Sequence, residues 1–260
     1  MNNNKENLIK LLKLVDEISK QPGNEWFKRE LDRNPVNKSM DVNSTAIEEI
    51  YEYCIKVIIK DHAQKFYSDF KLLDIKERLI EDFIRMEKFR REDNFEGFCL
   101  AAYQQLEAIT NSLAEKLSLL EYLQQNKDIP ALHMYDRDTK TFVRKGNQTI
   151  GRLIFTTNEN AKILDFISAP INKWFFNHKL RLVIYVFYFN TEIRVNADLF
   201  ERVFDLGNYL HQGRNLNHRG VVQTKYQQDI LDDLIPNQHK YYFKFLGFLE
   251  DFTTRINYNL

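Results

Sequence analysis

Apolar residues recur every three or four positions over most of this 260-residue chain, which is the spacing of one face of an α-helix. The longest such stripe begins after Asp93 or Asn94, either of which can cap a helix, and continues to about Gln125. Its apolar members are Phe98, Ala102, Leu106, Ile109, Leu113, Leu117 and Leu120. At about 3.6 residues per turn the stripe covers roughly eight turns, so we predict one long helix here.

The same spacing predicts shorter helices on both sides of this one. Thr45–Glu48 and Asp74–Glu77 each have the spacing of a helix-capping signal, and Asn237 can cap the last helix. The further predicted helices cover residues 6–20, 45–70, 160–168, 198 to about 213 and 222–234, together with the stretches that follow Asp74 and Asn237.

Two segments depart from the helical spacing. Residues 130–158 contain Gly146, Gly151 and short β-favouring runs, and we expect a loop with a small hairpin there. Residues 174–189 are rich in β-branched and aromatic side chains, as in a buried strand, yet their length suits a buried helix. The neighbouring helices and the lack of clear partner strands favour the helix, although periodicity leaves both open.

Composition agrees with a helical fold. Phe (20) and Tyr (13) are abundant while Gly (8) and Pro (5) are scarce, which favours long packed helices over a turn-rich β architecture. We predict a mainly α fold, a helical bundle with a small irregular or β-hairpin insert around residues 130–158. Residues 1–43 would form an N-terminal helix and an irregular segment that Trp26 and Phe27 anchor onto the core, and residues 44–260 would form a single domain that contains the insert.

The overall charge of the chain does not point to a nucleic-acid or membrane protein. Acidic and basic residues balance at 37 each, so no global field marks a nucleic-acid or membrane protein. A local run of cations lies in the insert, and it is either a solvated face or a contact for a polyanion. This run consists of Arg137, Lys140, Arg144, Lys145 and Arg152.

The expected location is the cytoplasm. The N-terminus lacks the apolar core of a signal peptide, and the most apolar run, Leu180–Phe189, has about half of the ~20 residues that a membrane span needs. Cys54 and Cys99 lie in apolar helical stretches and are expected to be buried, reduced thiols.

The sequence lacks a Walker loop, a GxGxxG cradle, HExxH and GxSxG, and its one concentration of candidate chemistry is a polar segment near the C-terminus. Eight of the nine residues from Gln212 to Gly220 are polar or Gly, and they include Arg214, His218 and Arg219, with His211 just before them. If the segment is helical, Arg214 and His218 lie on one face.

These residue types suit metal-independent RNA cleavage. His can exchange protons near neutral pH, and Arg can hold phosphate oxygens through two N–H groups. Neither metal nor cofactor is expected. An alternative is that the segment is only a helix C-terminus, where Arg and His complement the helix dipole and bond the last carbonyls.

The segment Arg214-Asn215-Leu216-Asn217-His218 resembles the signature of the HEPN superfamily, an all-helical group with many prokaryotic RNases. The family motif is Arg, commonly followed by Asn, and then His after four to six residues, whereas three intervene here. The stretch Tyr103–Glu107 and Asn111 are also similar to HEPN helices, which often carry a polar or acidic residue facing the motif.

The resemblance implies a metal-independent endoribonuclease of a prokaryotic defence or toxin system. Arg214 would bind the scissile phosphate, His218 would transfer protons and Asn215 would hold the geometry, while Arg219, Asn217 and His211 would contact the substrate. Glu107 would orient Arg214. HEPN RNases usually pair two motifs, so the resemblance implies a homodimer. The alternatives are a catalytically silent module of the same fold that binds RNA, a nucleotide or a protein partner, and a helical scaffold.

Overall fold

The chain folds mainly into α-helices, as the sequence predicts. The computed structural model describes residues 44–144, 148–189, 195–214 and 224–260, together with Lys13, Val15 and Lys20. Residues 1–58 and 59–260 form two compact units. In the first unit Lys13 and Val15 are helical, as expected within 6–20, while the predicted anchor residues Trp26 and Phe27 lie outside the described residues. α3 (Ser44–Phe66) begins in this unit.

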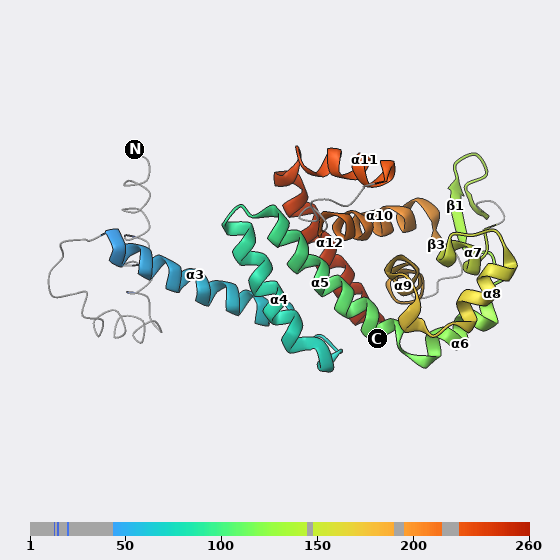
Figure 1. The fold of residues 1–260 in the computed structure, drawn as a ribbon, viewed down its shortest axis with the longest axis horizontal. Helices are drawn as coiled ribbons and strands as arrows, with labels where there is room; N and C mark the ends of the chain where they lie inside the picture. Colours follow the sequence, from blue (N-terminus) through green and yellow to red (C-terminus); the bar gives the residue numbers. More distant parts are fainter. Residues whose placement is uncertain are drawn as a thin grey trace. The chain divides into compact units, whose positions relative to one another are not determined.

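One helix organises the second unit. α5 (Phe95–Ala114) contacts α4 (Leu73–Arg91), α9 (Phe176–Val183), α10 (Ala197–Gly213) and α12 (Gln238–Asn259) (Figure 1). Its start is fixed by Asn94, whose side chain accepts a hydrogen bond from the backbone N–H of Gly97 at 2.8 Å. Because helices surround it, α5 is buried on several sides rather than along one stripe.

The prediction of a single helix to residue 125 is wrong. α5 ends at Ala114, Lys116 has an extended conformation, and α6 (Leu117–Asn126) continues in a new direction. The turn buries Leu119 and Leu123 fully, whereas Leu120, a member of the predicted stripe, is only partly buried. Neither Gly nor Pro marks this break in the sequence, so the apolar spacing alone could not reveal it.

The insert forms the expected hairpin. β1 (Leu132–Asp136) and β2 (Thr141–Arg144) pair antiparallel, with His133 opposite Arg144. Asp136 closes the turn, because its carboxylate accepts hydrogen bonds from the Asp138 backbone N–H and the Thr139 hydroxyl, both at 2.9 Å. The cations Arg137, Lys140 and Arg144 lie exposed on this hairpin.

Two parts of this region differ from a simple hairpin insert. The β-favouring run Leu153–Phe155 lies in a short helix, α7 (Ile150–Phe155). β3 (Val195–Asn196) pairs parallel to β1 and gives the sheet order β2-β1-β3. Figure 1 shows β1, β3, α7 and α8 (Asn160–Ser168) gathered at one end of this unit.

The ambiguous segment 174–189 is helical. After a short turn of 3-10 helix, η2 (Ile171–Lys173), α9 runs into a π-helical stretch, η3 (Ile184–Tyr188). α10, α11 (Lys225–Leu234) and α12 complete the chain. The predicted Asp74 cap is wrong, because α4 begins at Leu73 and Asp74 lies in its first turn, where a carboxylate complements the helix dipole.

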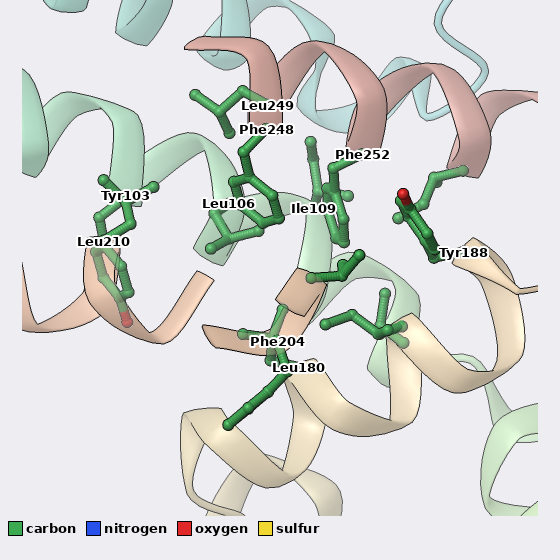
Figure 2. Close-up of a cluster of buried hydrophobic side chains, with 14 of the residues drawn as sticks. Tyr103, Leu106, Ile109, Leu180, Tyr188, Phe204, Leu210, Phe248, Leu249 and Phe252 are labelled. Atoms are coloured by element: carbon green, nitrogen blue, oxygen red, sulfur yellow. The ribbon is translucent and has the colours of Figure 1, made fainter. Parts of the chain in front are cut away.

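The core of the second unit lies where α5, α9, α10 and α12 meet. Figure 2 shows its large side chains, among them Leu106, Leu180 and Phe252, pointing toward one another from these helices. Cys99 belongs to this core and is a free thiol, as predicted, whereas Cys54, also free, is only partly buried. Among the described helices, none has both the length and the apolar content needed to cross a membrane.

Candidate functional site

Arg214 directly follows α10, whose end is held close to α5. The helix starts at Asn196, whose side-chain oxygen accepts a hydrogen bond from the Leu199 backbone N–H at 2.9 Å. At its other end, a Cβ on Gly213 would lie 3.1 Å from the Cys99 sulfur. Gly at this position therefore permits the close approach of the two helices, and it places Arg214 over the side chains of α5.

The guanidinium of Arg214 contacts two residues of α5. Its central carbon lies 4.2 Å from the centre of the Tyr103 ring, and its Nη1 lies 3.8 Å from Oε1 of Glu107. The Tyr103 hydroxyl donates a 2.8 Å hydrogen bond to the same Oε1. Tyr103 and Glu107 are one helical turn apart, so one face of α5 supplies both an aromatic surface and a carboxylate. The predicted pairing of Glu107 with Arg214 is therefore present in the structure.

Electrostatics keep the hydroxyl of Tyr103 protonated. Burial and, secondly, the hydrogen bond to Glu107 raise its pKa above the ordinary value. The Arg214 and Glu107 side chains are 32% and 35% exposed, so both remain accessible from solvent. Glu107 contacts one guanidinium nitrogen, and a guanidinium carries five N–H donors, so donors remain for the oxygens of an anion.

His211 lies beside this pair but within an aromatic cluster. Its ring centre is 5.2 Å from the rings of both Tyr103 and Phe176, and it stacks nearly parallel to Tyr103. Burial, and then the charge of Arg214, lower the pKa of His211 to about 4. Its imidazole is thus neutral at physiological pH, and it adds no positive charge beside Arg214.

A second cation contacts α5 one helical turn beyond Glu107. Lys179 of α9 donates a 3.0 Å hydrogen bond to Oδ1 of Asn111 and is 8% exposed. Tyr103, Glu107 and Asn111 therefore form a polar stripe that faces cations from two other helices. Sequence reasoning did not include Lys179 in the site; its only signal was a cation within the largely apolar segment 174–189.

The structure brings three of the predicted site residues together, namely Arg214, His211 and Glu107. The other four, Asn215, Asn217, His218 and Arg219, lie outside the described residues. Within the described part of the chain no group of three or more His, Cys, Asp or Glu side chains is arranged to hold a metal ion. Comparisons of the chain with protein-family models, with curated proteins and with solved structures find no match.

Proposed function

We propose that this chain is a metal-independent, HEPN-like endoribonuclease of a prokaryotic defence or toxin system that acts in the cytoplasm as a homodimer. The observation that carries the proposal is the setting of Arg214. Its guanidinium is packed on Tyr103 and paired with Glu107, yet about a third of the side chain faces solvent. An arginine that is oriented in advance loses little conformational freedom when it binds a phosphate.

In the proposed reaction the ribose 2′-hydroxyl attacks the adjacent phosphorus and the 5′-oxygen leaves, which gives a 2′,3′-cyclic phosphate and a 5′-hydroxyl end. The proton of the 2′-hydroxyl must be removed and one must be given to the leaving oxygen. His218 takes part in this transfer, and Arg214 stabilises the charge on the phosphorus oxygens. Asn215 holds the geometry of the two, while Asn217 and Arg219 contact the substrate.

A catalytically silent module that binds RNA is the second candidate. It is favoured by the fact that the two contacts that orient Arg214, the Tyr103 ring and the Glu107 carboxylate, need no proton-transfer group. Such a site can hold a phosphate without a histidine beside it. The two candidates therefore share the ligand and differ only in His218.

Cleavage of a labelled mixed-sequence RNA in EDTA separates the candidates. Wild type is compared with His218→Ala and Arg214→Ala, and the matched controls are His239→Ala and Arg202→Ala, which change an exposed residue of the same type. All variants are first checked for folding by circular dichroism and for mass by sedimentation equilibrium.

We expect loss of about 10²- to 10⁴-fold in rate for the two site variants, cyclic phosphate ends in the wild-type product and unchanged rates for the controls. Binding without cleavage by a wild-type dimer would support the silent module. Equal cleavage by wild type and Arg214→Ala would exclude this site as the source of activity.

A further inference from the structure

A cavity of about 310 Å³ lies between α9, α10 and α11, away from the contacts of Arg214. Its volume is at the lower end of the ~300–1,000 Å³ typical of small-ligand sites. The lining residues are Thr156, Phe175, Asn177, His178, Arg181, Phe204, Asn208 and Tyr226. The Arg214 site uses none of them, and the sequence analysis singled out none of them.

The cavity wall contains a chain of polar side chains. Nδ2 of Asn177 donates to Oδ1 of Asn208 at 3.3 Å, and Nδ2 of Asn208 donates to the Tyr226 hydroxyl at 2.6 Å. Asn208 is 1% exposed, so the protein holds an amide inside its core at this point. Buried amides are maintained where hydrogen bonding specifies an arrangement, either within the protein or with a ligand.

Three polar atoms of the lining residues have no hydrogen-bond partner among the described residues. They are Oδ1 of Asn177, Nδ1 of His178 and Nε of Arg181. Unpartnered buried polar atoms are unfavourable, and each calls for an explanation. All three atoms are covered from solvent, and the exposed parts of the same wall are those of Asn177, which is partly buried, and of Arg181, whose side chain is 12% exposed. An amide offers both a donor and an acceptor and a guanidinium offers donors, so a ligand edge that carries both donors and acceptors matches this wall.

The positive charge in the cavity wall is offset by nearby carboxylates. Among the described lining residues, Arg181 is the one with a permanent charge. Its central guanidinium carbon lies 3.6 Å from the Phe204 ring centre, and its Nη1 lies 3.9 Å from Glu201 Oε1. Asp205 is also near enough to act on the pKa of Arg181. Burial and Arg181 lower the pKa of His178 to about 4, which keeps it neutral. Such a wall suits an uncharged planar group better than a phosphate.

The mouth of the cavity carries exposed aromatic rings. Phe175 is 70% exposed and Tyr226 is 56% exposed, although both line the cavity. Exposed rings beside amide groups are the surfaces on which unpaired bases stack while their edges form hydrogen bonds.

We propose that this cavity binds a nucleobase, which stacks on Phe175 and Tyr226 and forms hydrogen bonds with Asn177 and Arg181. The base could belong to a free nucleotide or to single-stranded RNA. In the second case the cavity is a base subsite for the same strand that the phosphate site holds, and the inference rests on the proposed function. Arg214, directly after α10, lies six residues beyond Asn208, about 9 Å along the helix axis, which is within the length of a short RNA strand.

Binding is measured by calorimetry with the four nucleoside 5′-monophosphates and with a short single-stranded 2′-O-methyl RNA, which has no free 2′-hydroxyl and cannot be cleaved by the proposed reaction. The variants are Phe175→Ala and Phe175→Trp. Phe243→Ala is the matched control, because Phe243 is 71% exposed on α12. A folding check by circular dichroism precedes each titration.

We expect Phe175→Ala to weaken binding roughly 5- to 150-fold, the range for loss of one base–aromatic stack. Phe175→Trp should bind as tightly as wild type or more tightly, and Phe243→Ala should be unchanged. Binding of a monophosphate identifies a nucleotide site, and binding of the oligonucleotide alone identifies an RNA subsite.

Absence of saturable binding by wild type, or equal binding by wild type and Phe175→Ala, overturns the proposal. Cleavage is not part of this measurement, so its outcome is independent of the proposed activity. A protein that binds bases through Phe175 but does not cut RNA would retain the cavity assignment and lose the endoribonuclease.

Discussion

Two histidines in the second unit should make the protein less stable as the pH falls. His178 is packed against the rings of Phe155, Phe166 and Phe175, and His211 is packed against Tyr103 and Phe176. Burial of each ring, and then a nearby arginine, lower its pKa from 6.5 to about 4. The folded state therefore holds both rings neutral, whereas the unfolded chain can protonate them.

The size of the effect follows from proton linkage. Between the unfolded pKa of 6.5 and the folded pKa of about 4, the unfolded state binds more protons, so stability falls as the pH is lowered. The full slope is roughly 1.4 kcal/mol per pH unit for each group, and it develops below the unfolded pKa. From about pH 7 to about pH 5 each histidine costs about 2 kcal/mol, or roughly 4 kcal/mol together. This is a large part of the ~5–15 kcal/mol that stabilises a typical domain.

Urea unfolding at both pH values measures this loss. Carboxylates titrate too, so wild type is compared with His178→Gln and His211→Gln, which stay neutral, and with His239→Gln, which changes an exposed histidine. Each buried-site variant should lose about 2 kcal/mol less than wild type when the pH is lowered, and the control should behave as wild type. A variant that keeps the whole pH dependence of wild type would refute the assignment of a neutral buried imidazole at that position.

Three further predictions concern other contacts. A double-mutant cycle of Glu107→Ala and Arg214→Ala in urea unfolding should give a coupling of about 0.5 kcal/mol that declines with salt, because both side chains are about a third exposed; a coupling of several kcal/mol would contradict it. Gly207→Ala should be about 1–3 kcal/mol less stable than Gly247→Ala, because a Cβ on Gly207 would lie 2.9 Å from a buried leucine methyl while Gly247 has open space; equal thermal stability would disprove this. Cys99 should resist alkylation until the protein unfolds, because burial raises the pKa of its thiol, and fast labelling of the native protein detected by mass spectrometry would count against it.

The helices could be predicted largely from local signals, and the errors have physical causes. Asn94 and Asn237 lie directly before helices as expected, and α8 has the bounds that the apolar spacing predicts, residues 160–168. The break after Ala114 was missed because burial of Leu119 and Leu123, rather than Gly or Pro, determines it. Residues 174–189 could not be decided by pattern, since a helix that is covered by neighbours shows no polar face.

The site could be predicted only in part. Glu107 is expected as a partner of Arg214 from the resemblance to HEPN helices, which often carry an acidic residue facing the motif, and the two side chains lie 3.8 Å apart. Lys179 and the cavity at Arg181 and Asn208 depend on how α9 packs against α5 and α10, which no spacing within one segment reveals. The environment of His211 likewise comes from Phe176, which lies 35 positions earlier in the chain.

The parallel pair of β1 and β3 bears on the order in which the chain folds. Leu132 and Val195 are partners although the whole segment containing α7, α8 and α9 lies between them. Closing so long a loop costs more chain entropy than closing the hairpin of β1 and β2, or than packing the adjacent helices α4 and α5. We therefore expect these neighbouring pairs to form early and the β1–β3 pair to form late. Since Asn196 caps α10, the helix that carries Arg214 gains its fixed starting point in that late step.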